Sequence, residues 1–93
     1  MQLPVNYNDI PYTLRRTIRE EYARIQGGLC CHCGNPLEGK PADEVLAKGI
    51  NTRLFPDNFF KHPVHLHHNH DSGMTIGAVH AYCNAVLWQH YGE

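Results

Sequence analysis

Histidine is concentrated in one part of this 93-residue chain. Six of the eight histidines lie between His62 and His80, and four of them fall in the run from His65 to His70. Imidazoles packed this densely destabilise a fold if they are merely buried. They are also the metal ligands and proton acceptors that metal-assisted hydrolysis requires. This run is therefore the main candidate for chemistry.

Hydrolysis of a phosphodiester needs a base that activates water and a cation that stabilises the developing charge. A neutral imidazole is a suitable base near pH 7, and Asn84 offers a carbonyl oxygen of the kind that Mg²⁺ or Mn²⁺ accepts. In a regular strand, His67 and His68 would face opposite sides. Both can serve one site only if the chain leaves strand geometry, which the segment 69–73 permits. His65 and His67 are an alternative pair, because they would share one strand face.

The cysteines indicate a second kind of site. Two pairs of candidate ligands have metal-binding spacing: Cys30 with Cys33, and His80 with Cys83. Residues at i and i+3 share a helix face, so the second pair could meet the first in a closed, structural Cys3His zinc site. The alternatives are a redox pair, whose usual βαβ context is absent, or plain buried cysteines. Cys31 and His32 are the alternative ligands within the Cys-rich turn 29–37, here called the knuckle.

Length and composition predict one small domain spanning residues 1–93, of a size that usually needs a staple such as a metal. The first residues lack the pattern of a secretory signal, and no apolar run is long enough to span a membrane. We therefore expect a cytoplasmic protein, in which cysteines remain reduced and grouped Cys and His residues bind zinc.

The formal net charge of −1 argues weakly against strong non-specific nucleic-acid binding, although a bound metal would add local positive charge. The basic residues cluster in one place only: Arg15, Arg16, Arg19 and Arg24. The cluster is either a solvated helix face or a surface that contacts phosphates.

Hydrophobic spacing and turn residues predict the elements that must position these groups. A helix is expected over Pro11–Gln26, ended by two glycines. The remaining expected elements are a short helix over Pro41–Lys48, a strand over Val64–His68, a turn over Asn69–Gly73, a returning strand over Met74–Ile76 and a helix over Ala78–Tyr91. We interpret the phenylalanines of the long loop, Phe55, Phe59 and Phe60, as core residues and not as base-stacking ones.

Two stretches, Leu66–Gly73 and Gly77–Asn84, resemble the His-Me finger (ββα-metal) nucleases, and most closely the HNH and phage recombination endonuclease VII-like branch. The resemblance extends over residues 29–91. It implies an α+β fold, a small zinc-stapled ββα-metal domain, to which this chain adds the N-terminal helix at 11–26.

The resemblance also implies residue roles. His68 matches the general base, His67 the preceding metal ligand and Asn84 the second metal ligand. His70 matches a supporting active-site imidazole that contacts phosphate. The residues that match structural zinc ligands are Cys30, Cys33, His80 and Cys83.

Three departures from the family pattern stand out. His80 replaces the usual cysteine, which is a conservative exchange for zinc. Ile76 stands where endonuclease VII-like sequences often carry arginine, so a phosphate contact is expected to be missing. The segment 40–63 is longer than many family members need.

The leading hypothesis is a metal-dependent DNA endonuclease with a structural Zn²⁺ and a catalytic Mg²⁺ or Mn²⁺, with Ni²⁺ or Zn²⁺ as alternatives. The main alternative is a non-catalytic zinc-binding module that contacts nucleic acid or protein. A third reading is a histidine cluster that holds a second structural or adventitious metal. Because no separate DNA-reading module is visible, we expect low sequence specificity, or targeting by a homodimer or a partner protein. The resemblance implies phage or prophage origin and action in a host bacterial cytoplasm.

Overall fold

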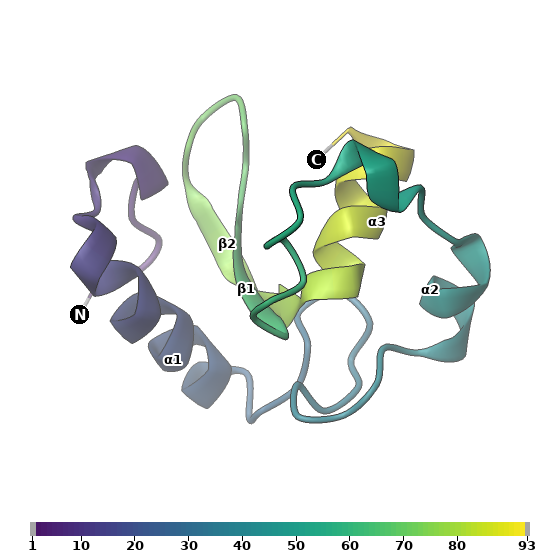
Figure 1. The fold of residues 1–93 in the computed structure, drawn as a ribbon. Coiled ribbons are helices and arrows are strands. Elements are labelled where there is room, and N and C mark those ends of the chain that lie inside the picture. The colour runs from purple at the N-terminus through teal and green to yellow at the C-terminus, as the bar shows by residue number, and fades with distance from the viewer. Residues whose placement is uncertain (1, 93) are drawn as a thin grey trace.

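A β-hairpin lies between two helices in the computed structural model, which describes residues 2–92 (Figure 1). The described chain has the α+β composition that was predicted, with three α-helices and one two-stranded antiparallel sheet. The elements in chain order are α1 (Arg15–Ile25), α2 (Asp43–Lys48), β1 (Val64–His68), β2 (Thr75–His80) and α3 (Ala81–Tyr91). Short 3-10 turns precede α1 at Tyr7–Asp9 and Tyr12–Leu14, and another lies at Thr52–Leu54.

The first strand of the hairpin is confirmed at the residues predicted for it, but the second strand is longer than expected. It continues through Ala78 and Val79, which are fully buried and pair with β1. The last helix consequently begins at Ala81 and not at Ala78, with His80 as its N-cap residue. Small and β-branched residues at these positions satisfy a buried strand as well as a helix, so periodicity alone did not locate the boundary.

The N-terminal helix is also shorter than predicted, because Tyr12–Leu14 forms a 3-10 turn and the α-helix starts at Arg15. Its buried face carries Ile18 and Tyr22, and the Tyr22 hydroxyl lies 2.8 Å from Thr75 Oγ1 in β2. The predicted short helix is confirmed. It spans Asp43–Lys48, two residues fewer than predicted, and Gly49 ends it. Figure 1 shows α1 on one side of the hairpin and α3 on the other.

The core lies where α1, the hairpin and α3 meet. Its buried members include Ile10, Ile18, Tyr22, Ala78, Val79, Cys83 and Val86. The phenylalanines of the long loop, predicted to be core residues, instead form a separate partly exposed aromatic cluster. In this cluster Phe55 packs against Trp88 of α3 (ring centroids 5.4 Å apart), and Phe59 packs against His65 of β1 (4.7 Å). The long loop thus supports the outer side of β1.

The segment before α1 docks on the hairpin tip. The Tyr7 amide donates to the Gly73 carbonyl (2.7 Å), and Asn6 pairs with Met74 in a β-bridge. Gly73 has a φ of 79°, and a Cβ there would lie 2.7 Å from Asn6 Oδ1, so only glycine fits this turn without strain. This docking brings N-terminal side chains next to the histidine run.

None of the helices in residues 2–92 combines the length and the apolar character needed to cross a membrane.

Candidate functional site

Four side chains converge at the base of α3 in the arrangement predicted for a structural metal. Cys30 and Cys33 come from the knuckle, His80 from the end of β2, and Cys83 from the first turn of α3. Their ligand atoms all lie within 4.8 Å of one another. Ligands of a tetrahedral zinc ion are separated by about 3.3–3.8 Å. The cluster can therefore hold a structural metal such as zinc with only small adjustments.

The histidine of this cluster is oriented for metal binding. His80 Nε2 lies 2.8 Å from the Pro36 carbonyl oxygen, and its Nδ1 lies 3.5 Å from the sulfur atoms of both Cys33 and Cys83. When Nε2–H donates to the carbonyl, the lone pair of Nδ1 points into the cluster. This is the outer-shell hydrogen bond that metal-binding histidines commonly make.

The thiols are also tuned towards ligation. The hydrogen bond from Cys83 lowers the pKa of Cys30 to about 4, so Cys30 is a thiolate at neutral pH. The same interaction, together with burial, raises the pKa of Cys83, which donates the proton of this hydrogen bond. A cation bound among the sulfur atoms would displace that proton, because thiolate is the ligating form. Cys31, in the same knuckle, is exposed and stands outside the cluster.

Gln26, at the end of α1, braces the knuckle against β2. Its Nε2 donates to the carbonyls of Leu29 (2.7 Å) and Ala78 (2.9 Å), and its Oε1 accepts from the Ala78 amide (2.9 Å). Gly77 permits this approach, since a Cβ there would lie 2.7 Å from Gln26 Oε1. One glutamine thus connects α1, the knuckle and the strand that leads to His80.

Replacing Gln26 with alanine is expected to lower the free energy of unfolding by about 2 kcal/mol, because it removes three hydrogen bonds and leaves the partly buried Ala78 amide without its side-chain acceptor. Urea denaturation of the zinc-loaded protein measures the change. Gln89→Ala is the matched control, since Gln89 makes one exposed hydrogen bond of this type, to the Asn51 amide. Equal stabilities of the two variants would show that the brace contributes nothing beyond a surface contact.

A cavity of about 640 Å³, here called the histidine cavity, lies between α1 and β1. Its lining residues include His65, His68, His70 and Asn84 from the predicted site region, and Arg15, Arg16 and Arg19 from α1. No aspartate or glutamate is among its described lining residues. The cavity is therefore electropositive and suits an anionic ligand.

His68, the predicted base, is held by aromatic contacts on two sides. Its ring stacks on Tyr7, with centroids 3.9 Å apart and planes at 6°, and it meets His70 edge-on at 4.9 Å. Partial burial, followed by the charges of His70 and His67, lowers the pKa of His68 below its usual value. The ring is therefore neutral at pH 7 and able to accept a proton.

Asn84, the predicted metal ligand on α3, lies beside His65. Its Nδ2 is 3.1 Å from His65 Nδ1, and His65 Nε2 is 2.8 Å from the Phe59 carbonyl oxygen. When Nε2–H donates to Phe59, Nδ1 is the acceptor of the hydrogen bond from the Asn84 amide. A half-turn of the Asn84 amide places its oxygen where Nδ2 lies. To bind one ion together, the two side chains would have to give up this hydrogen bond and turn their acceptor atoms towards the cavity.

His67, the other predicted metal ligand, is only 5% exposed and pairs with Gly77 across the hairpin. It is not among the lining residues of the histidine cavity. The strand register shifts between His67 and His68, so the chain departs from regular strand geometry between these two histidines. The structure thus gathers His68, His70 and Asn84 around one cavity and adds His65. The role of His67 stays a prediction.

Sequence reasoning gave too little weight to two contributors. His65 was visible as the strand-face partner of His67, two residues before it. The α1 arginines were visible as a cluster, but nothing local in the sequence indicated that they face the histidines. Comparison with protein-family models, curated proteins and solved structures finds no match to this chain.

Proposed function

We propose that this protein is a metal-dependent DNA endonuclease of the His-Me finger type, with a structural zinc ion in the Cys3His cluster. The observation that carries the proposal is the histidine cavity, which is lined both by Asn84 and by His68, whose pKa is lowered. Asn84 directly follows the zinc-cluster residue Cys83 on α3. The helix α3 thereby contributes one residue to the Cys3His cluster and the next residue to the histidine cavity, where we propose that hydrolysis occurs.

Each residue of the cavity has a separate task in this proposal. His68 accepts the proton of the attacking water, and the stacked Tyr7 ring fixes the plane of the imidazole. Asn84 and a strand histidine bind the divalent ion, while His70 contacts the phosphate. When bound, that ion supplies positive charge to the phosphate and to the leaving oxygen.

The ligand types favour a transition metal as the catalytic ion. Carboxylates and water suit Mg²⁺, whereas imidazole suits Zn²⁺ and Ni²⁺, and the histidine cavity offers imidazoles and one amide without a carboxylate. We therefore expect cleavage of plasmid DNA to be faster with Ni²⁺ or Zn²⁺ than with Mg²⁺ at equal concentration.

Plasmid nicking by the purified zinc-loaded protein tests the proposal. Asn84→Ala is expected to lower cleavage by about a hundredfold at a fixed metal concentration, because outer- and inner-shell ligand losses typically cost 10–100-fold in affinity or activity. The structural zinc content should be unchanged. His65→Ala and His67→Ala, compared in the same assay, identify the strand histidine that shares the ion with Asn84. Absence of nicking by the wild-type protein with every metal would exclude the proposal.

A non-catalytic zinc-binding module is the second candidate, and the net charge of −1 is the observation that favours it. Such a module would retain zinc and bind its partner while cleaving no DNA. The same nicking assay therefore separates the two candidates. The expected cytoplasmic location and targeting by a homodimer or partner protein remain proposals that accompany the nuclease.

A further inference from the structure

We propose that three arginines of α1, Arg15, Arg16 and Arg19, bind the phosphate backbone of the DNA substrate, and that Arg15 contacts the phosphate that lies next to His68. This inference rests on the proposed nuclease function and names the residues by which the cavity holds its substrate. Endonuclease VII-like sequences often carry an arginine where this chain has Ile76. In this proposal, Arg15 of α1 supplies the phosphate contact that such an arginine would make.

Among the three arginines, Arg15 has the most structural evidence for binding a phosphate. Its Nε is buried without a hydrogen-bond partner, and it makes no ion pair with any described residue. Its guanidinium lies 4.3 Å from the centroid of the Tyr7 ring, the same ring that stacks on His68. Nε is enclosed by the protein, so a ligand would bind the terminal guanidinium nitrogens of Arg15, which lines the histidine cavity and has no carboxylate partner among the described residues. A phosphate oxygen is the acceptor that arginine binds best in this setting.

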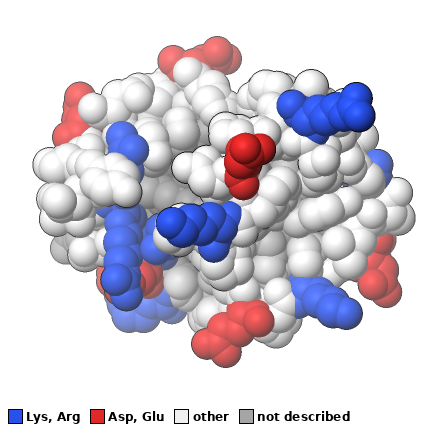
Figure 2. All heavy atoms as spheres, in the orientation of Figure 1, with Lys and Arg blue, Asp and Glu red and all other residues white. Residues whose placement is uncertain are grey.

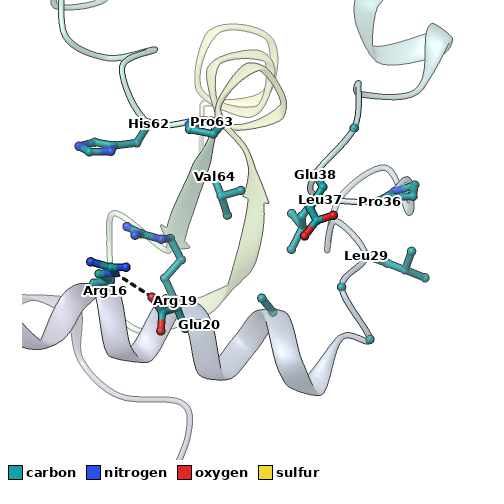
Figure 3. Close-up of a pocket in the computed structure, with 14 residues that line it drawn as sticks. Arg16, Arg19, Glu20, Leu29, Pro36, Leu37, Glu38, His62, Pro63 and Val64 are labelled. Carbon is teal, nitrogen blue, oxygen red and sulfur yellow. Dashed lines mark hydrogen bonds and ion pairs between the residues drawn. The ribbon is translucent and has the colours of Figure 1, made fainter.

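The other two arginines extend the positive surface along the helix. Arg16, Arg19, His62 and Val64 line both the histidine cavity and a second cavity of about 870 Å³, so the two hollows adjoin. Figure 3 shows Arg16 and Arg19 rising from α1, with His62 across the opening from them. Together the two hollows are lined by α1 residues from Arg15 to Ala23, nearly the whole helix, which favours an extended polyanion over a small anion.

The local charge supports the same partner. Four of the eight lysines and arginines of the chain are on α1, and Figure 2 shows blue side chains gathered over this helix while the other basic residues are scattered. Glu20 is paired with Arg16 at 2.8 Å, whereas Arg19 makes no ion pair with a described residue. Glu38 is the other carboxylate on the wall of the second cavity. The net charge of the chain therefore conceals a cationic strip beside the histidines.

Binding of a fluorescent 20-base-pair duplex to the zinc-loaded protein, without other divalent ions, tests the strip. Arg15→Gln and Arg19→Gln are each expected to weaken binding about tenfold and to reduce the slope of log affinity against log salt by about 0.9. Arg24→Gln is the matched control, because Arg24 lies on the same helix and its substitution makes the same charge change, but Arg24 lines neither cavity. It should bind within about twofold of the wild type.

The maximal cleavage rate at saturating DNA shows whether Arg15 contacts the phosphate being cut or only contributes positive charge to DNA binding. Arg15→Gln should lower the maximal rate at least tenfold and Arg19→Gln should not, because only Arg15 would stabilise charge at the phosphate being cut. If Arg15→Gln fails to fold, as judged by zinc content and melting temperature, Arg15→Lys replaces it. That variant keeps the salt slope but loses the two-pronged contact and hence the rate.

Equal binding by the Arg15, Arg19 and Arg24 variants would overturn the inference even if the wild type cleaves DNA. Conversely, a wild type that binds through these arginines but never cleaves would contradict the nuclease while leaving the binding strip intact.

Discussion

Replacing His68 with alanine is expected to reduce DNA cleavage by about 10²- to 10⁴-fold, the usual contribution of a positioned general base. The expectation follows from three observations on one side chain. His68 lines the histidine cavity, its pKa is lowered so that it is neutral at pH 7, and the stacked Tyr7 ring fixes its plane. Single-turnover cleavage of plasmid DNA at saturating metal measures the loss.

Two comparisons separate a lost base from a disturbed fold. His90→Ala removes an exposed histidine whose Nε2 lies 2.8 Å from the Gly49 carbonyl oxygen and which does not line the cavity, so its activity should match the wild type. Free imidazole should restore part of the rate of His68→Ala, because a diffusible base can fill the space left by the ring. Wild-type cleavage by His68→Ala would show that the base is another group.

Replacing Cys83 with serine is expected to abolish zinc binding and, with it, the folded state. Structural zinc sites contribute about 10–16 kcal/mol in small zinc-finger peptides, which equals or exceeds the whole stability of a typical domain. Cys83 is completely buried at the junction of β2 and α3, so its loss also leaves a polar group in the core. Zinc stoichiometry and the thermal melting curve measure the two effects together.

The knuckle itself provides the matched control. Cys31→Ser changes the same atom in an exposed residue that stands outside the four-residue cluster, so one zinc per chain and a wild-type melting temperature are expected. A chelator that removes zinc from the wild type should unfold it in the same way as the Cys83 substitution. A Cys83→Ser protein that folds normally without zinc would refute the structural role of the metal.

The parts of the fold that the sequence predicted are those encoded by short-range spacing. The alternation in Val64–His68 is typical of a strand, and the two Cys/His pairs, each three residues apart, converge as the spacing requires. The start of α3 was misplaced because Ala78 and Val79 suit either a buried strand or a helix. Local patterns therefore defined most elements but left this boundary open.

The candidate site was predictable only in part, because its remaining contacts join distant residues. Val5 is hydrogen-bonded to Thr75 across 70 positions, and this docking of the N-terminal segment brings Tyr7 onto His68. The position of Asn84 beside His65 likewise depends on how α3 crosses β1. No spacing rule in a single sequence reports such pairings, since they result from tertiary packing.

The long separation between the two halves of the zinc cluster has a consequence for the order in which the protein matures during its synthesis. Cys33 leaves the ribosome 47 residues before His80. During synthesis, Cys30 and Cys33 are therefore exposed to solvent before the other two residues of the cluster have been made. Closing a loop of this length costs only modestly more entropy than closing a short one, and the metal offsets that cost when it binds. Asn84 emerges immediately after the last zinc ligand. The nascent chain therefore cannot complete the histidine cavity before all four residues of the metal-binding cluster have been made.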